Sequence, residues 1–281
     1  MKTLLLVVAA TLAATAQPAF DVKVIGHGTP MLLIPGLASS GETWDSTVAH
    51  YKAHYECHVF TMAGFVGVPR IPAPVLDGYR DAIAAYIRDK SLHKPVIVGH
   101  SLGGFVALAI AAKYPDLPGK IVIVDADPFL AGIMDPDSTP EKAKAFSEQM
   151  RGYMSKPSPT EYEAYVKSGA GTRAMVSKDS DLARLIGWSL ASDRTAVTDA
   201  FVEMMAADLR PELDKIQCPA LVLTTWIGYK EYTDHAKTEA NVRGQYARLK
   251  GVDIEITDTA RHFIMWDDPD WMLAKMDKFL Q

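Results

Sequence analysis

A serine flanked by glycines is the part of the sequence best suited to chemistry. Residues 99–103 read Gly-His-Ser-Leu-Gly and directly follow the apolar run Pro95-Val-Ile-Val98. Glycines two positions before and two positions after Ser101 let the backbone turn sharply against its neighbours, where a Cβ would clash. A turn of this kind pushes the serine hydroxyl out of the fold. Ser101 is therefore predicted to act as a nucleophile.

The segments around this turn are of the types that must position it. Residues 96–98 predict a buried strand, and residues 102–114, rich in Ala, Val, Leu and Ile, predict a helix that is apolar on nearly every face. Similar apolar runs alternate with helical patterns at 76–87 and 272–280. This alternation predicts an α/β fold with a mostly parallel central sheet and helices on both faces. The predicted strands are 31–34, 58–62, 96–98, 121–124, 221–224 and 252–256.

Residues 126–209 interrupt the strand pattern. Short helical patterns follow one another here, and two of them begin with Ser138-x-x-Glu141 and Ser158-x-x-Glu161, which resemble capping boxes. We therefore expect a helical cap inserted into one domain that spans residues 17–281. Methionines of the cap suit its own core, the more common role, or an acyl-binding pocket. These are Met150, Met154, Met175, Met204 and Met205.

His262 is the predicted base for Ser101. A serine hydroxyl is a weak nucleophile at neutral pH, so it needs a base within hydrogen-bond reach and a third group that orients the base. His262 closes the segment Asp258-Thr-Ala-Arg-His262, which directly follows the last predicted strand. Because parallel strands end at one edge of a sheet, this loop and Ser101 are expected at the same edge. A solvated surface histidine is the alternative.

The order of these parts resembles that of the α/β hydrolases of the carboxylesterase type, over essentially all of the chain after residue 16. Residues 31–37 resemble the family's oxyanion strand and loop, residues 99–103 its nucleophile elbow, and residues 261–263 its histidine loop. Most members carry His-Gly where this chain has Pro-Gly at 35–36, a change that leaves the backbone donor in place. The resemblance implies an oxyanion hole made by the amides of Leu37 and Leu102, each worth roughly 3–4 kcal/mol.

The carboxylate that orients His262 departs from the common family pattern. Most members carry it directly after the penultimate strand, where residues 225–230 read Thr-Trp-Ile-Gly-Tyr-Lys without a carboxylate. A minority carry it one strand earlier, and Asp125 ends the run 121–124 in that position. We therefore predict Asp125 as the acid, although an aspartate there also suits capping of the adjoining turn. The alternatives are Asp127, Asp234 and Asp258.

Composition and charge restrict the possible partners. The chain has 281 residues, 48% of them hydrophobic, which is enough for one large core. Its 34 acidic and 29 basic residues give a net charge of -5, and no run of Lys or Arg is long enough to follow a phosphate backbone. Nucleic acid is therefore not an expected partner.

The first 16 residues predict a cleavable secretory signal. Lys2 precedes an apolar stretch from Leu4 to Ala14, and small residues at Ala14 and Ala16 come before Gln17. An uncleaved anchor is disfavoured because the stretch has about 11 residues, whereas a spanning helix needs roughly 20. We expect a secreted or periplasmic protein with no membrane span after processing.

Two further groups of residues are interpreted as structural. Cys57 and Cys218 begin apolar runs and are read as small buried hydrophobes, although a disulfide is compatible with the sequence. His50, His54 and His58 recur every four residues, as in a zinc site on a helix. Residues 55–62 predict a strand instead, which breaks that face. Neither a metal nor a cofactor is expected.

Together these residues predict a serine hydrolase that cleaves carboxylic esters of small molecules through an acyl-enzyme. Ser101 attacks, His262 carries the proton and Asp125 orients the imidazole. One alternative is an acyltransferase or perhydrolase, because the same triad serves any acceptor that outcompetes water. Another is a catalytically silent ligand binder with the same fold, against which the intact serine and histidine argue.

Overall fold

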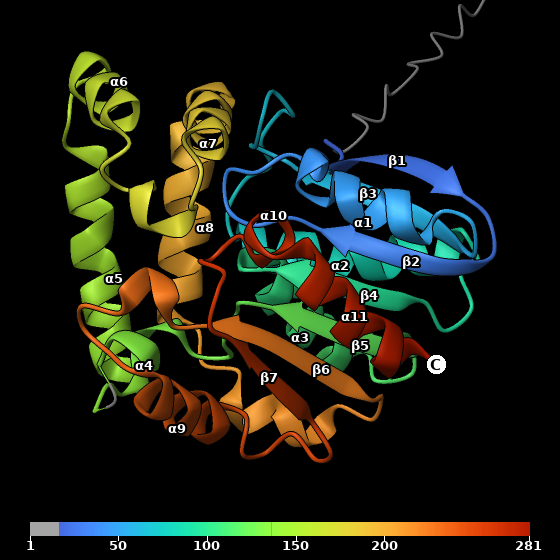
Figure 1. Cartoon of the computed structure of the whole chain (residues 1–281). Coiled ribbons are helices and arrows are strands. Elements are labelled where there is room, and N and C mark those ends of the chain that lie inside the picture. Colours follow the sequence, from blue (N-terminus) through green and yellow to red (C-terminus); the bar gives the residue numbers. More distant parts are fainter. Residues whose placement is uncertain (1–16, 136) are drawn as a thin grey trace, which may run out of the picture.

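A seven-stranded sheet forms the centre of the molecule (Figure 1). The computed structural model describes residues 17–135 and 137–281, so the predicted signal at 1–16 lies outside the described residues. The strand order is β1-β3-β2-β4-β5-β6-β7, and all neighbours are parallel except β1 and β3. The strands are β1 (Phe20–Gly26), β2 (Thr29–Ile34), β3 (Tyr55–Met62), β4 (Val96–His100), β5 (Lys120–Val124), β6 (Ala220–Thr225) and β7 (Asp253–Thr257).

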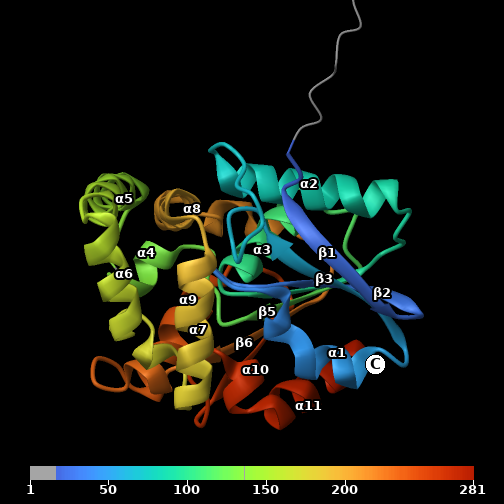
Figure 2. The same cartoon turned by 90° about the horizontal axis from the view of Figure 1, so that it is seen from above.

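Helices cover both faces of the sheet, as predicted for an α/β fold. Alternate strand residues such as Ile97 and Ile123 pack with α2 (Val75–Asp89) and α3 (Leu102–Lys113) on one face. Their neighbours, such as Val98 and Val124, pack on the other face with three helices at the opposite side of the sheet in Figure 2. The central strands β2, β4, β5 and β6 are buried on both faces, which explains their continuous apolar runs. The three helices are α1 (Asp45–Tyr51), α10 (Ile264–Asp267) and α11 (Pro269–Leu280).

The described residues between β5 and β6 are helical and form a layer beside the sheet (Figure 1). Buried Met205 lies in the core of this layer, whereas buried Met204 packs into the core cluster of the sheet domain. The other three methionines singled out above are half-buried. The helices are α4 (Leu130–Met134), α5 (Pro140–Ser155), α6 (Pro159–Ser168), α7 (Asp179–Ala191) and α8 (Arg194–Ala206), with short 3-10 turns η2 (Arg173–Met175) and η3 (Arg210–Lys215). We refer to α4–α8 and η2 as the cap.

Specific bonds join the cap to the sheet domain. The loop after β3 contacts the junction of α7 and α8. Gly67 N donates to Ala191 O at 3.0 Å, and Val66 N donates to Ser192 Oγ at 3.0 Å. The Glu203 carboxylate of α8 accepts hydrogen bonds at 3.0 and 2.9 Å from the first two amides of α2. Those amides have no partner inside their own helix. These two sets of bonds are among those that hold the cap on the core.

Two local features differ from the sequence-based expectation. Strand β1 was not predicted, because it is an edge strand with mostly exposed residues and lacks a buried apolar run. Helix α5 begins one residue later than the expected Ser138 box, since Thr139 is its N-cap and accepts a bond from Lys142 N. The capping box of Ser158 and Glu161 at the start of α6 is present as predicted. The residue that serves as the N-cap of a helix therefore depends on the conformation of the turn before it.

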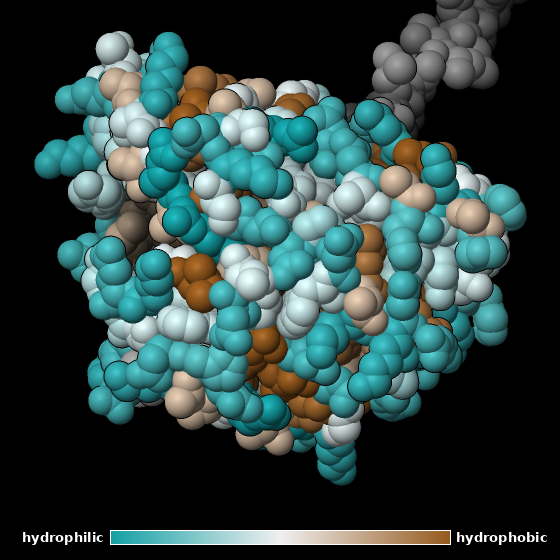
Figure 3. Space-filling model, in the orientation of Figure 1, coloured by the Kyte–Doolittle hydropathy of each residue, from teal (hydrophilic) through white to brown (hydrophobic). Residues whose placement is uncertain are grey.

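The outer surface and the remaining segments complete the fold. Helix α9 (His235–Gln245) and the 3-10 turns η1 (Gly41–Trp44) and η4 (Ile227–Tyr229) connect the strands. The face shown in Figure 3 is mostly hydrophilic, and hydrophobic residues gather over β6 and β7 at the edge of the sheet. In the residues 17–135 and 137–281, no helix is long and apolar enough to cross a membrane.

Candidate active site

Ser101 occupies a tight turn between β4 and α3. Its φ of 52° lies in the left-handed region that L-residues rarely adopt. A Cβ on Gly99 would lie 2.2 Å from the Gly103 carbonyl oxygen, and a Cβ on Gly103 would lie 2.2 Å from Ile34 O. Both contacts are shorter than any side chain tolerates, so only glycine fits the two positions. The turn therefore has the close packing that the sequence pattern predicts.

Asp125 ends the strand next to Ser101. His100 of β4 is in register with Val124 of β5, and Ser101 N donates to Val124 O at 2.9 Å. Asp125 also has a positive φ of 47°, and its amide donates to Leu223 O of β6 at 2.7 Å. Because neighbouring strands lie about 4.8 Å apart, the two side chains leave the sheet side by side at its carboxyl edge.

The carboxylate of Asp125 contacts the imidazole of His262. The distance between Asp125 Oδ2 and His262 Nδ1 is 2.5 Å, and both side chains are mostly shielded from solvent. The second oxygen, Oδ1, accepts hydrogen bonds from Thr224 Oγ1 at 2.9 Å and from Thr225 N at 3.2 Å. One oxygen is thus held by β6, which leaves the other to orient the imidazole.

The histidine loop is fixed against the elbow. Thr225 Oγ1 donates to Ala260 O at 2.5 Å, and His100 Nε2 donates to His262 O at 3.1 Å. The His100 and His262 rings lie 4.5 Å apart, and His100 is equally close to Phe263. Burial, followed by the nearby His262, lowers the pKa of His100 well below its usual range. His100 is therefore a neutral support for the loop.

Ser101 and His262 reach the same edge of the sheet from segments far apart in the sequence. Asp125 links them, because it neighbours Ser101 in the sheet and bonds His262 Nδ1. Within the described residues, the Ser101 hydroxyl makes no hydrogen bond to His262. Such bonds are often long in sites without substrate and tighten when one binds. The bonded Nδ1 leaves Nε2 as the nitrogen to receive a proton.

The predicted oxyanion amides flank the elbow. A Cβ on Gly36 would lie 3.2 Å from the Ser101 Cβ and 3.0 Å from His100 Nδ1, so the loop that carries Leu37 contacts the serine directly. The Leu102 amide is the first of α3 and has no acceptor inside its helix. Among the backbone and side-chain bonds of the described residues, Leu37 N also has no acceptor. Both amides are suited to a developing negative charge.

Two of the three rival acids bond to other residues. Asp258 accepts a hydrogen bond at 2.7 Å from Trp226 Nε1, and Asp234 caps α9 by accepting from Lys237 N at 2.9 Å. Asp127 lies two residues after Asp125, and its Oδ1 is buried without a partner in the described part of the chain. Of the four carboxylates considered, the structure places Asp125 against the imidazole.

Asp127 gives the stability of the fold a pH dependence. Burial, and then the charge of Asp125, raises the pKa of Asp127 from its usual 3.8 to about 7. Between these values the folded chain holds a proton that the unfolded chain has lost, so rising pH lowers the free energy of unfolding, by about 2–4 kcal/mol at pH 8. Asp127→Asn, neutral throughout, is expected to unfold at a higher temperature than the parent at pH 8.

The comparison must be made at two pH values. Thermal unfolding followed by circular dichroism is expected to show the gain of Asp127→Asn at pH 8 and to show it shrinking near pH 4, where both side chains are neutral in the folded chain. A difference between the two proteins that is the same at both pH values would contradict a raised pKa of Asp127.

Two of the three regularly spaced histidines have structural partners. His50 of α1 lies 3.0 Å from the Asp277 carboxylate, whereas His58 of β3 lies between Tyr86 and Glu56. His50 and His58 belong to different elements, so the three histidines share no helical face, as predicted. Cys57 and Cys218 are free; Cys57 is buried as expected, whereas Cys218 is half-buried. Burial raises the pKa of each thiol to about 11.

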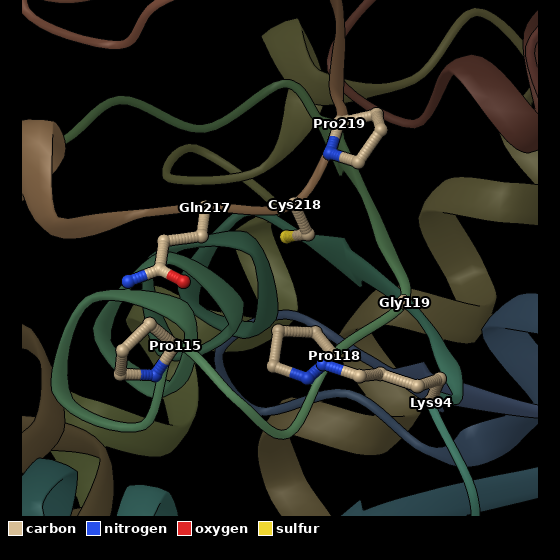
Figure 4. Close-up of a pocket in the computed structure, with 7 residues that line it drawn as sticks. All are labelled: Lys94, Pro115, Pro118, Gly119, Gln217, Cys218 and Pro219. Carbon is tan, nitrogen blue, oxygen red and sulfur yellow. The ribbon is translucent and has the colours of Figure 1, made fainter.

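A cavity of about 430 Å³ lies at the opposite edge of the sheet (Figure 4). Its walls precede β4, β5 and β6 and include Lys94, Cys218 and three prolines. The Lys94 ammonium donates to Asp116 O at 2.8 Å, and the Cys218 thiol is a weak nucleophile because of its raised pKa. This cavity therefore offers no activated nucleophile comparable to Ser101 at the carboxyl edge of the sheet.

Sequence reasoning missed the threonines that hold Asp125. Thr224 and Thr225 occupy the end of the penultimate strand, the place where most α/β hydrolases carry the acid. The sequence does show two threonines and no carboxylate at this position, and this combination could have indicated that they hold an acid on the neighbouring strand. His100 was also missed as a support, because its contact with the His262 carbonyl joins residues 162 positions apart.

The fold and this arrangement define a hydrolase of the α/β class, and the sequence profile of the Alpha/beta hydrolase family matches residues 31–275. The chain belongs to this family. It is similar to the pimeloyl-[acyl-carrier protein] methyl ester esterase of Nitrosospira multiformis, with 24% identity over 94% of this chain and 98% of that protein. It is also similar to the N-formylmaleamate deformylase of Pseudomonas putida, with 26% identity over 91% and 90% of the two chains.

A solved structure shows the same fold. The enol-lactonase from Burkholderia xenovorans LB400 superposes with a TM-score of 0.73 at 19% sequence identity, and the match covers 93% of this chain and 96% of the lactonase. The architecture predicted from the sequence is thereby confirmed.

Proposed function

We propose that this protein is a serine esterase that cleaves carboxylic esters of small molecules through an acyl-enzyme. The observation that carries the proposal is the 2.5 Å contact between Asp125 and His262, placed beside a serine in a strained elbow. The names of the two related sequences, a methyl ester esterase and a deformylase, support acyl-carbonyl chemistry. Export to the periplasm or medium, with removal of residues 1–16, is part of the proposal.

The first half of the reaction forms the acyl-enzyme. His262 Nε2 removes the Ser101 proton as the oxygen attacks the ester carbonyl, and Asp125 stabilises the imidazolium that results. The negative charge that develops on the carbonyl oxygen is received by the amides of Leu37 and Leu102. Collapse of this intermediate breaks the ester C–O bond, and His262 returns the proton to the departing alcohol.

The second half releases the acid. Water takes the place of the alcohol, gives a proton to His262 and attacks the acyl carbon. The bond to the Ser101 oxygen then breaks, and that oxygen recovers its proton from the imidazole. Every step uses side chains and amides at the carboxyl edge of the sheet.

The function is tested with the chain that begins at Gln17 and a panel of p-nitrophenyl esters of increasing acyl length. The expected result is saturable release of nitrophenolate from at least one ester. Acid quenching during turnover is expected to give a protein whose intact mass has increased by one acyl group. Absence of hydrolysis with every ester would contradict the proposed activity, and hydrolysis without any acylated species under slow-turnover conditions would contradict the acyl-enzyme.

Thr224→Val tests the support of the acid. Valine has nearly the same shape as threonine but cannot donate to Asp125 Oδ1, which then keeps only the Thr225 amide. The carboxylate loses orientation, so kcat is expected to fall about tenfold, which corresponds to about 1.4 kcal/mol, with little change in KM. Steady-state kinetics on the best ester measures both constants. A raised KM with unchanged kcat would show that the hydroxyl acts on substrate binding instead.

A further inference from the structure

The cap is bonded directly to the histidine loop. The guanidinium of Arg261, the residue before His262, donates through Nη1 to Arg173 O at 3.0 Å and to Val176 O at 2.8 Å. Both carbonyls belong to cap segment 173–178, which contains η2 and the start of the connection to α7. One side chain thus spans from the loop that carries the predicted base to the cap above it.

The residue after His262 is joined to the same segment. Phe263 N donates to Met175 O at 3.2 Å. The Asp267 carboxylate accepts from Ser177 N at 3.1 Å, from Ser177 Oγ at 2.9 Å and from Arg261 N at 2.9 Å. His262 therefore lies between two residues that are both tied to segment 173–178. We call this set of bonds the clamp.

Aromatic packing continues the connection. Phe263 stacks on Trp266 with ring centroids 4.4 Å apart and an interplanar angle of 22°. Trp266 lies 5.6 Å from Trp188 of α7, and the Arg184 guanidinium lies 5.2 Å from the Trp266 ring. The histidine loop and α7 are consequently packed as one unit on this side of the site.

We propose that Arg261 is a positioning residue that holds His262 in line with Ser101 by fixing the loop to the cap. The inference rests on the proposed function. Asp125 aligns the His262 imidazole through one hydrogen bond, to Nδ1. One bond leaves the ring free to pivot, so its position also depends on how firmly the backbone of the loop is held. Misplacement of a reacting group by about 1 Å can cost on the order of 100-fold in rate. The sheet holds the loop through Thr225 and His100, and Arg261 adds the hold from the cap side.

The test compares three variants of the full mature chain on one ester. Arg261→Met keeps the aliphatic stem and removes both donors, Arg261→Lys restores a single point donor, and Arg243→Met is a matched control on α9, where that arginine pairs only with Glu239 in the described part of the chain. We expect kcat to fall about tenfold or more in Arg261→Met and less in Arg261→Lys, with KM changed less than twofold. Arg243→Met is expected to match the parent.

The pH profile and the active-site concentration separate positioning from other roles. Rates are expressed per site that reacts with an organophosphonate, so unfolded protein does not count. A positioning role lowers the plateau of the kcat profile without moving its midpoint. Parental kcat per reactive site in Arg261→Met, or a shifted midpoint with an unchanged plateau, would overturn the inference. Those outcomes, with Ser101→Ala still inactive, would leave the proposed function standing.

Discussion

Replacement of Ser101 by alanine is expected to lower kcat on the best ester by about 10⁴- to 10⁶-fold. The change removes the only atom proposed to bond to the acyl group, while the oxyanion amides and the binding site remain. Alanine differs from serine only by the missing oxygen and keeps the Cβ. It therefore fits the strained turn at φ 52° as serine does, and the chain is expected to stay folded. Initial rates with active-site titration of the parent measure the effect.

A serine on the cap surface provides the control. Ser168 of α6 is exposed, and its hydroxyl donates only to Tyr165 O at 2.6 Å among the described bonds. Ser168→Ala is expected to keep the parental rate. Hydrolysis by Ser101→Ala within tenfold of the parent, in a preparation free of other esterases, would show that another nucleophile does the chemistry.

Asp125→Asn is expected to reduce kcat by about 10³- to 10⁴-fold, with KM nearly unchanged. Asparagine has the same shape and still accepts from Thr224, but it carries no charge to stabilise the imidazolium. Its amide group can also donate to His262 Nδ1 and so favour the wrong tautomer of the ring. The reaction then lacks a base at Nε2 in most molecules. Steady-state rates from pH 5 to 10 measure the loss.

Asp258→Asn is the matched control, because its carboxylate bonds Trp226 rather than His262. Its rate is expected to remain within about threefold of the parent. If Asp258→Asn lost activity and Asp125→Asn retained it, the acid would be assigned to the wrong strand.

The sheet was largely predictable because its central strands are buried on both faces. Six of the seven strands appear as apolar runs in the sequence, and the predicted ranges differ from the observed ones mainly at their ends. Strand β1 was not predicted because its residues are mostly exposed and form no apolar run; its pairing with β3 decides its structure. The helical character of the segment between β5 and β6 was visible in its periodicity. Its attachment through Glu203 was not, since that bond joins residues 128 positions apart.

The candidate site was predictable to the extent that its chemistry is local. The elbow around Ser101 is encoded by glycines within five residues, and His262 directly follows a recognisable strand. Asp125 was inferred because the usual position has no carboxylate, and the structure places that side chain against His262. The bonds from Thr224 and Arg261 depend on how distant segments pack. Single-sequence patterns contain no information on such contacts.

Covalent labelling can show directly whether Ser101 is the nucleophile. The mature chain is treated with a fluorophosphonate, digested and mapped by tandem mass spectrometry, with the loss of esterase activity followed in parallel. We expect one adduct per chain, on Ser101 in the peptide that contains Gly-His-Ser-Leu-Gly, formed at the rate of inactivation. Inactivation with the adduct on another residue, or an active enzyme with Ser101 fully labelled, would contradict this expectation.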